Sequence, residues 1–213
     1  RRIDANNIFD LNRLGSNDTV EGGTSLTYGF DYVKNNKKDQ EVFKGSVASL
    51  VRLEENKNLP TESALGKKNS DIVGNVKISP NKHFNIDYNF SLDNNLDTSN
   101  YDSVKTTLSL NNFVTSFQYL QEQGDIGSES FIQNDTSFNF NKENSLNFST
   151  RKNKETDLTE FYNLIYQYKN DCLIAGIEYN KEYYTDSDLK PTEQLLFTIT
   201  ILPFGKVNTT NLR

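Results

Sequence analysis

From His83 to Leu92 the sequence reads HFNIDYNFSL, with apolar and polar residues in strict alternation. Successive side chains of a β-strand point to opposite faces, so a period of two predicts a strand with one apolar face and one polar face. The apolar positions are Phe84, Ile86, Tyr88, Phe90 and Leu92. This stretch therefore predicts a long strand that is exposed to water on one face only.

The same alternation recurs along nearly the whole chain, and no segment has the 3.6-residue period of a helix. The further segments are 21–34, 41–53, 71–79, 103–111, 113–121, 131–141, 144–151, 159–169, 172–183 and 193–202. Strands of globular proteins have about 5–6 residues, whereas a tilted strand needs about 9–11 to cross a membrane. The lengths of these segments favour strands that cross a membrane.

The predicted connections alternate between short turns and longer polar loops. Short turns are expected at Pro80-Asn81, Asn111-Asn112, Lys142–Asn144 and Lys169–Asp171. Longer loops are expected at Glu54–Lys68, Asp93–Asn100, Glu122–Ser130, Lys152–Asp157 and Thr185–Thr192. This order is typical of an antiparallel up-and-down outer-membrane barrel, which has tight periplasmic turns and longer outer loops.

Composition excludes several classes of function. The chain has 23 Lys and Arg against 29 Asp and Glu, a net charge of −6, so a nucleic-acid partner is not expected. One His and one Cys leave no metal site built from several such residues, and no acid–base pair or catalytic triad stands out. We expect no enzymatic activity, no cofactor and no metal.

The low apolar content fits a sheet that has lipid on one face and water on the other. Hydrophobic residues make up 34% of the chain, and half of each strand would line a hydrated interior. A sheet in lipid must close, and single-chain bacterial barrels close with an even number of strands. The candidate strands number about 11, which is odd, and the sequence has no Met and no signal peptide. These observations predict a partial transmembrane β-barrel, a piece of a larger one.

Two stretches carry more than a pattern. Residues 4–29 contain Asp4, Asn7, Phe9, Asn12-Arg13, Gly15, Asp18, Glu21, Gly23 and Tyr28-Gly29 in a spaced arrangement. Near the other end, Cys172 follows a tight turn, and Tyr183-Tyr184, Lys190-Pro191 and a final strand come after it. Both stretches resemble the LptD family, whose members assemble lipopolysaccharide in the outer membrane.

The resemblance implies a transport protein of the cell outer membrane. Such a barrel receives lipopolysaccharide from a periplasmic LptA-like bridge through an N-terminal domain that this sequence lacks, and an LptE-like lipoprotein plugs the barrel. It passes the lipid to the outer leaflet, among outer-membrane lipids, through a lateral gate. Residues 1–20 would then be an extracellular loop segment, 21–202 the C-terminal portion of the barrel, and 203–213 a periplasmic tail.

The resemblance also assigns roles to particular residues. Cys172 would bridge to the missing N-terminal domain, although a free thiol is the alternative. The last strand would form one side of the gate, through Leu195, Phe197, Ile199 and Ile201. The loop residues of the motif are Asp10, Asn12, Arg13, Asp18 and Glu21. Pairing of Arg13 with Asp18 and Glu21 would tie this loop over the lumen, and a solvated loop is the alternative.

Two other classes remain open from the pattern alone. A general porin or another outer-membrane channel would show the same alternation, but it needs neither the N-terminal motif nor Cys172. A soluble extracellular β-sheet adhesion module is the third candidate, and it would fold in buffer without detergent.

Overall fold

The computed structural model describes residues 2–14, 21–59, 61–124, 127–183 and 191–202. The elements of this part of the chain are β1 (Ser25–Asn35), β2 (Glu41–Arg52), the 3-10 helix η1 (Glu62–Ala64), β3 (Ile72–Asn81), β4 (Phe84–Leu92), β5 (Ser99–Leu110), β6 (Phe113–Gly124), β7 (Gly127–Asn139), β8 (Asn144–Asn153), β9 (Thr159–Lys169), β10 (Leu173–Glu182) and β11 (Thr192–Ile201). The predicted all-β class is confirmed.

The eleven strands form one open sheet, and each strand is hydrogen-bonded to its neighbours in sequence order. The registers of the hairpins are antiparallel, as in the pairing of Tyr28 with Ser49 or of Ile177 with Phe197. The strands have 9 to 13 residues. An up-and-down order in an open sheet is what a partial barrel requires.

Short connections alternate with longer ones as predicted, except at two places. The longer loop expected at Glu122–Ser130 is wrong, because β6 extends to Gly124 and β7 begins at Gly127, so most of that range is strand. The β3–β4 turn lies at Lys82-His83, and not at Pro80-Asn81, which continue β3. The register shifts between Ile78 and Asn81. Pro80 has no N–H to donate to the ladder, which accounts for the irregularity at this point. The amide of His83 then donates to Oδ1 of Asn81, at 2.8 Å, and closes the turn.

The chain divides into two compact units, one of residues 1–107 and 118–131 and the other of residues 108–117 and 132–213. In the first unit, the register aligns apolar side chains on one side of β1–β4. This apolar face carries Leu26, Tyr28, Phe30, Tyr32, Phe43, Val47, Val76, Ile78, Ile86, Tyr88 and Phe90. Phe30 is 65% exposed and Leu26 is 69% exposed, so the described residues leave much of this face uncovered.

The second unit repeats the two-faced arrangement. Its apolar face carries Leu146, Phe148, Leu164, Tyr166, Ile177, Tyr179, Leu195, Phe197, Ile199 and Ile201. The opposite, polar face carries Ser145, Asn147, Ser149, Asn163, Glu178 and Thr198. Asn163 donates to Glu178 at 2.6 Å, so the polar side chains bond across neighbouring strands.

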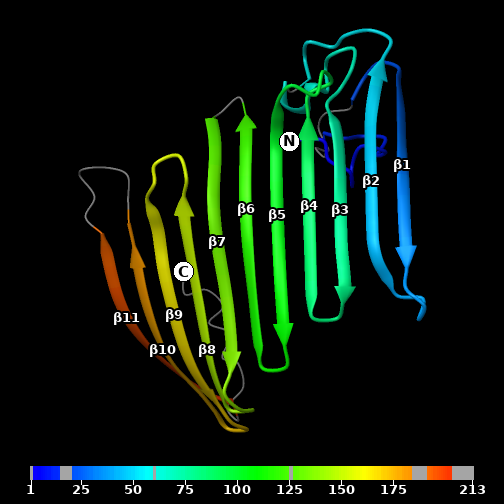
Figure 1. The fold of residues 1–213 in the computed structure, drawn as a ribbon. Coiled ribbons are helices and arrows are strands. Elements are labelled where there is room, and N and C mark those ends of the chain that lie inside the picture. Colours follow the sequence, from blue (N-terminus) through cyan, green and yellow to red (C-terminus); the bar gives the residue numbers. More distant parts are fainter. Residues whose placement is uncertain (1, 15–20, 60, 125–126, 184–190, 203–213) are drawn as a thin grey trace. The chain divides into compact units, whose positions relative to one another are not determined.

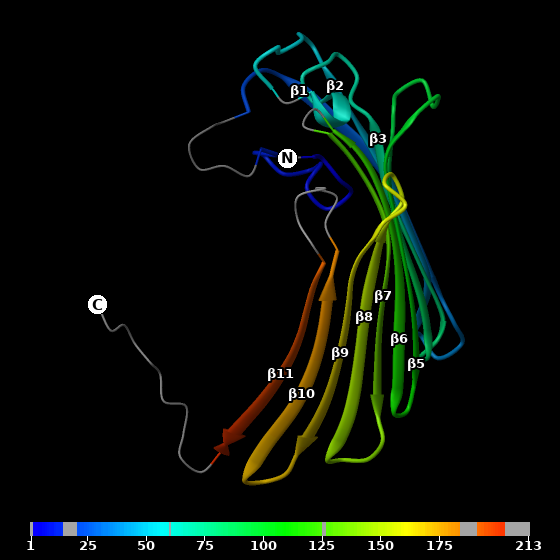
Figure 2. The same cartoon turned by 90° about the vertical axis from the view of Figure 1, so that its left-hand side faces the viewer.

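The buried core of the first unit lies on the polar face of β1–β3, at the end away from the hairpin turns. The N-terminal segment and the β2–β3 connection lie together there, on one side of the strands (Figures 1 and 2). They bring Ile3 and Ile8 against Ala48 and Val73, with Leu59 and Leu65 from the connection. Ile8 and Val73 are fully buried, so this end of the polar face is closed by packing.

Candidate functional site

The N-terminal segment is shaped by its own short polar side chains. Oδ1 of Asp4 accepts hydrogen bonds from the backbone amides of Asn6 and Asn7, at 2.7 and 3.1 Å. Oδ1 of Asn7 accepts from the Asp4 amide at 3.0 Å. Such reciprocal bonds hold a turn without a helix. The turn directs Ile3 and Ile8 toward the sheet, where both are buried.

A buried ionic cluster joins this segment to the sheet, and we call Arg13, Glu21 and Arg52 the Arg–Glu–Arg cluster. Nη1 of Arg13 donates to Oε1 of Glu21 at 2.6 Å, and Nη2 of Arg52 donates to the same oxygen. The side chains are 9%, 3% and 1% exposed, in the order Arg13, Glu21, Arg52. One carboxylate thus sits between two guanidinium groups away from water.

The remaining donors of the two arginines tie together four parts of the chain. Arg13 donates to the Ile8 carbonyl at 2.6 Å and to Oγ1 of Thr27 at 2.7 Å. Arg52 donates to the carbonyl of Leu65 at 2.7 Å and to that of Gly22 at 3.1 Å. The cluster therefore fixes the N-terminal segment and the β2–β3 connection against β1 and β2.

Only part of the predicted loop cluster comes together. The expected pairing of Arg13 with Glu21 is present. Asp10 is exposed and stands outside the cluster, while Oδ1 of Asn12 accepts from the Leu14 amide at 3.3 Å. Asp18 lies outside the described residues. Arg52 was not anticipated, although its position in the alternation places it on the same face as Ala48 and Leu50.

A second buried polar group lies beside the core. Asp71 is 2% exposed, and its Oδ2 accepts from Ser91 at 3.0 Å and from Asn100 at 2.7 Å. Its backbone amide donates to the Ser63 carbonyl at 3.0 Å. Buried carboxylates require such donors. Asp71 thereby holds the β2–β3 connection, β4 and β5 together.

Arg2 extends the attachment of the N-terminal segment to β5 and β6. Its Nε lies 3.2 Å from Oε1 of Glu122, and its Nη2 donates to the Gln123 carbonyl at 2.7 Å. The guanidinium also stands 5.3 Å from the ring centre of Tyr101. The segment is thus anchored at both of its ends.

The predicted gate residues all lie on β11. Leu195, Phe197, Ile199 and Ile201 alternate on its apolar face and are 51–73% exposed. β11 pairs with β10 over ten residues, from Thr192 to Ile201. Among the described residues β11 has no neighbour on its other edge.

Cys172 lies in the short β9–β10 turn and is exposed with a free thiol. Its backbone amide donates to Oδ1 of Asn170 at 3.0 Å, and the Leu173 amide donates to the same oxygen at 2.8 Å. The chain holds one cysteine, so a partner thiol would have to come from outside it.

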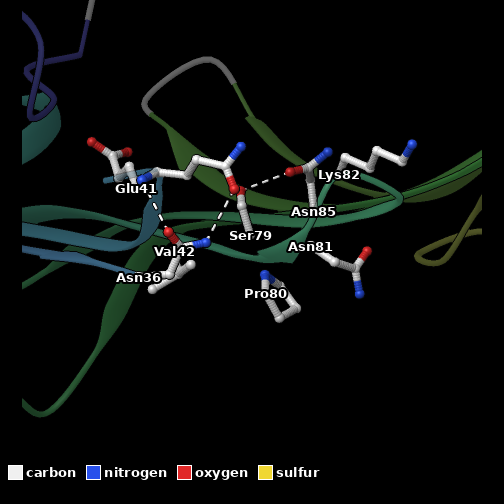
Figure 3. A pocket seen from close by; sticks show the side chains of 9 residues that line it. Asn36, Glu41, Val42, Ser79, Pro80, Asn81, Lys82 and Asn85 are labelled. Carbon is white, nitrogen blue, oxygen red and sulfur yellow. Dashed lines mark hydrogen bonds between the residues drawn. The ribbon is translucent and has the colours of Figure 1, made fainter. Parts of the chain in front are cut away.

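A polar pocket lies between the β1–β2 and β3–β4 turns. It has a volume of about 210 Å³, and its walls carry amide side chains from Asn36, Gln40, Asn81 and Asn85. Asn36 donates to Gln40 and Ser79 donates to Asn85, at 3.1 and 2.7 Å (Figure 3). Amides and hydroxyls in this arrangement can bind peptide or sugar groups by hydrogen bonds.

Metal sites and membrane-spanning helices were searched for in the part of the chain that is described. No group of three or more His, Cys, Asp or Glu side chains there could hold a metal ion. None of the helical segments in that part is long and apolar enough to cross a membrane.

Comparison with known proteins gives one family. The family model described as "LptD: LPS transport system D" matches residues 2–144, about two thirds of the chain. A comparison with curated proteins finds no match. The matched range includes the N-terminal segment, the Arg–Glu–Arg cluster and the strands from β1 to β7.

Proposed function

Because this chain belongs to the LptD family, we propose that it transports lipopolysaccharide and inserts it into the outer leaflet of the outer membrane. The family is one of outer-membrane transport proteins, and its involvement in lipopolysaccharide transport is established at that level. The family match over residues 2–144 is the observation that carries the proposal.

In this proposal the sheet is part of a transmembrane barrel, with residues 21–202 in the barrel. The apolar face meets lipid, and the polar face lines a hydrated lumen. Residues 1–20 belong to an extracellular loop, and 203–213 form a periplasmic tail. Exposed side chains such as Phe30 and Phe197, 65% and 70% exposed, support a lipid-covered face.

The N-terminal segment closes the outer end of the lumen. It covers the polar face at the end of the strands opposite the short turns (Figure 1), which in this orientation is the extracellular end. The Arg–Glu–Arg cluster holds it there. We assign it the role of a fixed cover that keeps this part of the lumen shut while lipid leaves sideways.

The last strand supplies one side of a lateral gate. Leu195, Phe197, Ile199 and Ile201 would touch acyl chains as lipid passes into the membrane. Among the described residues one edge of β11 has no neighbouring strand. A gate at this edge would open when β11 separates from a partner strand there. Pro191 precedes the strand and lacks an N–H, which weakens pairing at that end.

Cys172 would link the barrel to an N-terminal periplasmic domain. Its turn lies on the periplasmic side in this orientation, an oxidising compartment. Its exposure leaves the thiol accessible to a partner. Through that domain the protein would receive lipopolysaccharide from an LptA-like bridge, and an LptE-like lipoprotein would plug the lumen, with the amide-lined pocket as a contact.

A depletion experiment tests the function. In cells lacking the native gene, the full-length protein would be supplied and then depleted, and surface lipopolysaccharide would be measured with an antibody that does not enter the cell. We expect depletion of the supplied protein to reduce the surface signal while total lipopolysaccharide persists. An unchanged surface signal together with slower uptake of small solutes would support a general channel instead.

Replacing Cys172 with Ser tests the link. We expect loss of the oxidised cross-linked species on a non-reducing gel and less surface lipopolysaccharide. No change in either would remove Cys172 from the mechanism.

A further inference from the structure

An apolar groove of about 220 Å³ lies on the apolar face of β1–β4. Its walls come from four neighbouring strands, through Phe30, Tyr32, Gly45, Val47, Val76 and Phe90. These are residues that the described structure places on the face away from the core, the ionic cluster and the polar pocket. The groove is thus separate from the site described above.

Glycine makes the hollow. Gly45 pairs with Tyr32 on one side and with Val76 on the other, so it lies at the centre of the groove. A Cβ atom at this position would lie 3.2 Å from the Phe43 ring. The ring of Phe90 instead lies over Gly74, 2.3 Å from where its Cβ would be, so that second glycine is covered. The lining of the groove includes Gly45 and not Gly74, so the hollow lies at Gly45 beside the Phe43 ring.

Exposed lysines lie at the turn end of the same hairpins. Lys34 follows Tyr32 by two residues and shares its face, and Lys37 and Lys38 lie in the β1–β2 turn, with Lys82 in the β3–β4 turn. These four side chains have no acidic partner within 4.0 Å among the described residues. Asp39 and Glu41 also lie here, and Asp39 accepts a hydrogen bond from Asn35 at 2.8 Å. The set keeps a net positive charge in a chain of net charge −6.

An apolar groove that ends at a basic rim matches an anionic amphiphile. Strands rise about 3.3 Å per residue, so Lys34 stands about 7 Å beyond Tyr32, within reach of a headgroup at the membrane boundary. Lysine stems also extend along apolar surface while the ammonium stays in water. Basic residues at the edge of a membrane span attract anionic headgroups.

We propose that β1–β4 binds an anionic phospholipid of the periplasmic leaflet, with an acyl chain in the groove and the phosphate at Lys34, Lys37 and Lys38. The inference rests on the proposed function for its orientation, which puts the short turns on the periplasmic side. Phospholipid is favoured over lipopolysaccharide because the delivered lipid belongs to the opposite leaflet. The bound lipid would hold this part of the barrel in place in the membrane.

Native mass spectrometry of the full chain, released from detergent with added phosphatidylglycerol or phosphatidylcholine, tests the proposal. We expect the native chain to bind phosphatidylglycerol more tightly than phosphatidylcholine. The triple variant Lys34→Gln, Lys37→Gln, Lys38→Gln should bind phosphatidylglycerol roughly a hundredfold more weakly. The matched control is Lys57→Gln, Lys67→Gln, Lys68→Gln, which removes the same charge from exposed lysines in the β2–β3 connection and should leave binding unchanged.

Filling the groove tests the acyl-chain half of the proposal. Gly45→Val should weaken the binding of both lipids, and Val76→Phe provides a second filling variant if the first does not fold. Equal affinity for the two lipids, equal loss in both lysine triples, or unaltered binding by a folded groove-filling variant would each overturn the proposal. So would tighter binding of added lipopolysaccharide, or a groove occupied by a second copy, seen as dimers that Gly45→Val abolishes. If surface lipopolysaccharide is normal but the protein does not prefer phosphatidylglycerol, the lipid-binding inference is rejected and the proposed transport function stands.

Discussion

The Arg52 guanidinium donates a hydrogen bond to Oε1 of Glu21, and the two side chains are 1% and 3% exposed although 31 residues separate them in sequence. Arg13 donates to the same oxygen from the other side. Charges taken out of water in this way stabilise a fold only while each has its partner. The pair therefore makes the position of the N-terminal segment depend on a single carboxylate.

Glu21→Gln should release that segment. The substitution leaves two buried guanidinium groups without a countercharge, which costs about 3–5 kcal/mol for a buried pair. We expect a lower free energy of unfolding in urea and faster amide hydrogen exchange in residues 3–13 and 53–71.

The control for Glu21 is Glu54→Gln, which removes the same charge from an exposed position in the β2–β3 connection. It should change the free energy of unfolding by less than about 0.5 kcal/mol. Equal effects of Glu21→Gln and Glu54→Gln would contradict a structural role for the cluster.

Gly29→Ala should loosen the contact between the N-terminal segment and β1. A Cβ atom at Gly29 would lie 2.9 Å from Cζ of Phe9 and 2.8 Å from the Val47 carbonyl oxygen. Overpacking of this kind costs about 1–3 kcal/mol. Urea unfolding of Gly29→Ala measures the loss, and adding Phe9→Ala should recover part of it.

Gly22→Ala is the matched control for Gly29, because nothing lies within 4 Å of its Cβ position. A Gly29→Ala protein as stable as Gly22→Ala would mean that Phe9 does not pack on β1.

The β4–β5 loop should lose order at low pH through Asp93. Hydrogen bonds to its carboxylate hold the pKa of Asp93 below its ordinary value, first from the Thr98 amide and then from the Asp97 amide. A depressed pKa means that the stabilisation is complete above the ordinary carboxyl range, about 4, and is lost as the pH falls through the depressed pKa. Carbon-detected NMR of the Asp93 carboxyl group measures this directly. A midpoint at or above the ordinary value would be the contrary result.

A set of side-chain hydrogen bonds between β6 and β7 should be sensitive to the loss of one member, and Asn134 extends it by donating to the Ser116 carbonyl at 3.0 Å. Thr136 donates to Asn134 at 3.1 Å, Asn134 donates to Thr115 at 3.1 Å, and the two threonine hydroxyls lie 2.7 Å apart. Thr136→Val leaves the Asn134 carbonyl without this donor and should cost about 1–3 kcal/mol in urea unfolding from lipid vesicles.

Replacing the whole set tests the same idea in reverse. The triple variant Thr115→Val, Asn134→Leu, Thr136→Val removes the donors and acceptors of all three side chains and leaves only the Ser116 carbonyl without its side-chain donor, so it should be more stable than Thr136→Val alone. A triple variant less stable than Thr136→Val would show that the polar groups meet water at this place.

The strands could be predicted from the sequence because the alternation is local. Phe84 to Leu92 show their two faces within one segment, and β4 has those same bounds. The end of β3 was less accessible, since Pro80 suggested a turn two residues too early. The effect of Pro80 on the hydrogen-bond ladder depends on how β3 pairs with β4, and the alternation within one segment does not encode that pairing.

The candidate site could be predicted only in part, for a related reason. Arg13 and Glu21 lie eight residues apart, so their pairing was a reasonable hypothesis. Arg52 joins them through tertiary packing that covers the polar face with Ile3 and Ile8. Alternation says which face a residue occupies, but it does not say what lies against that face.

Site-directed spin labelling along β4 tests most directly whether lipid covers the apolar face. In the protein with Cys172→Ser, one Cys would be introduced at a time at residues 85–90, and the labelled protein placed in lipid vesicles. Labels at Ile86, Tyr88 and Phe90 should collide with oxygen more than with a water-soluble nickel chelate, and labels at Asn85, Asp87 and Asn89 should show the reverse. Chelate access on both faces, or apolar positions closed to both reagents as under a second protein layer, would contradict the account.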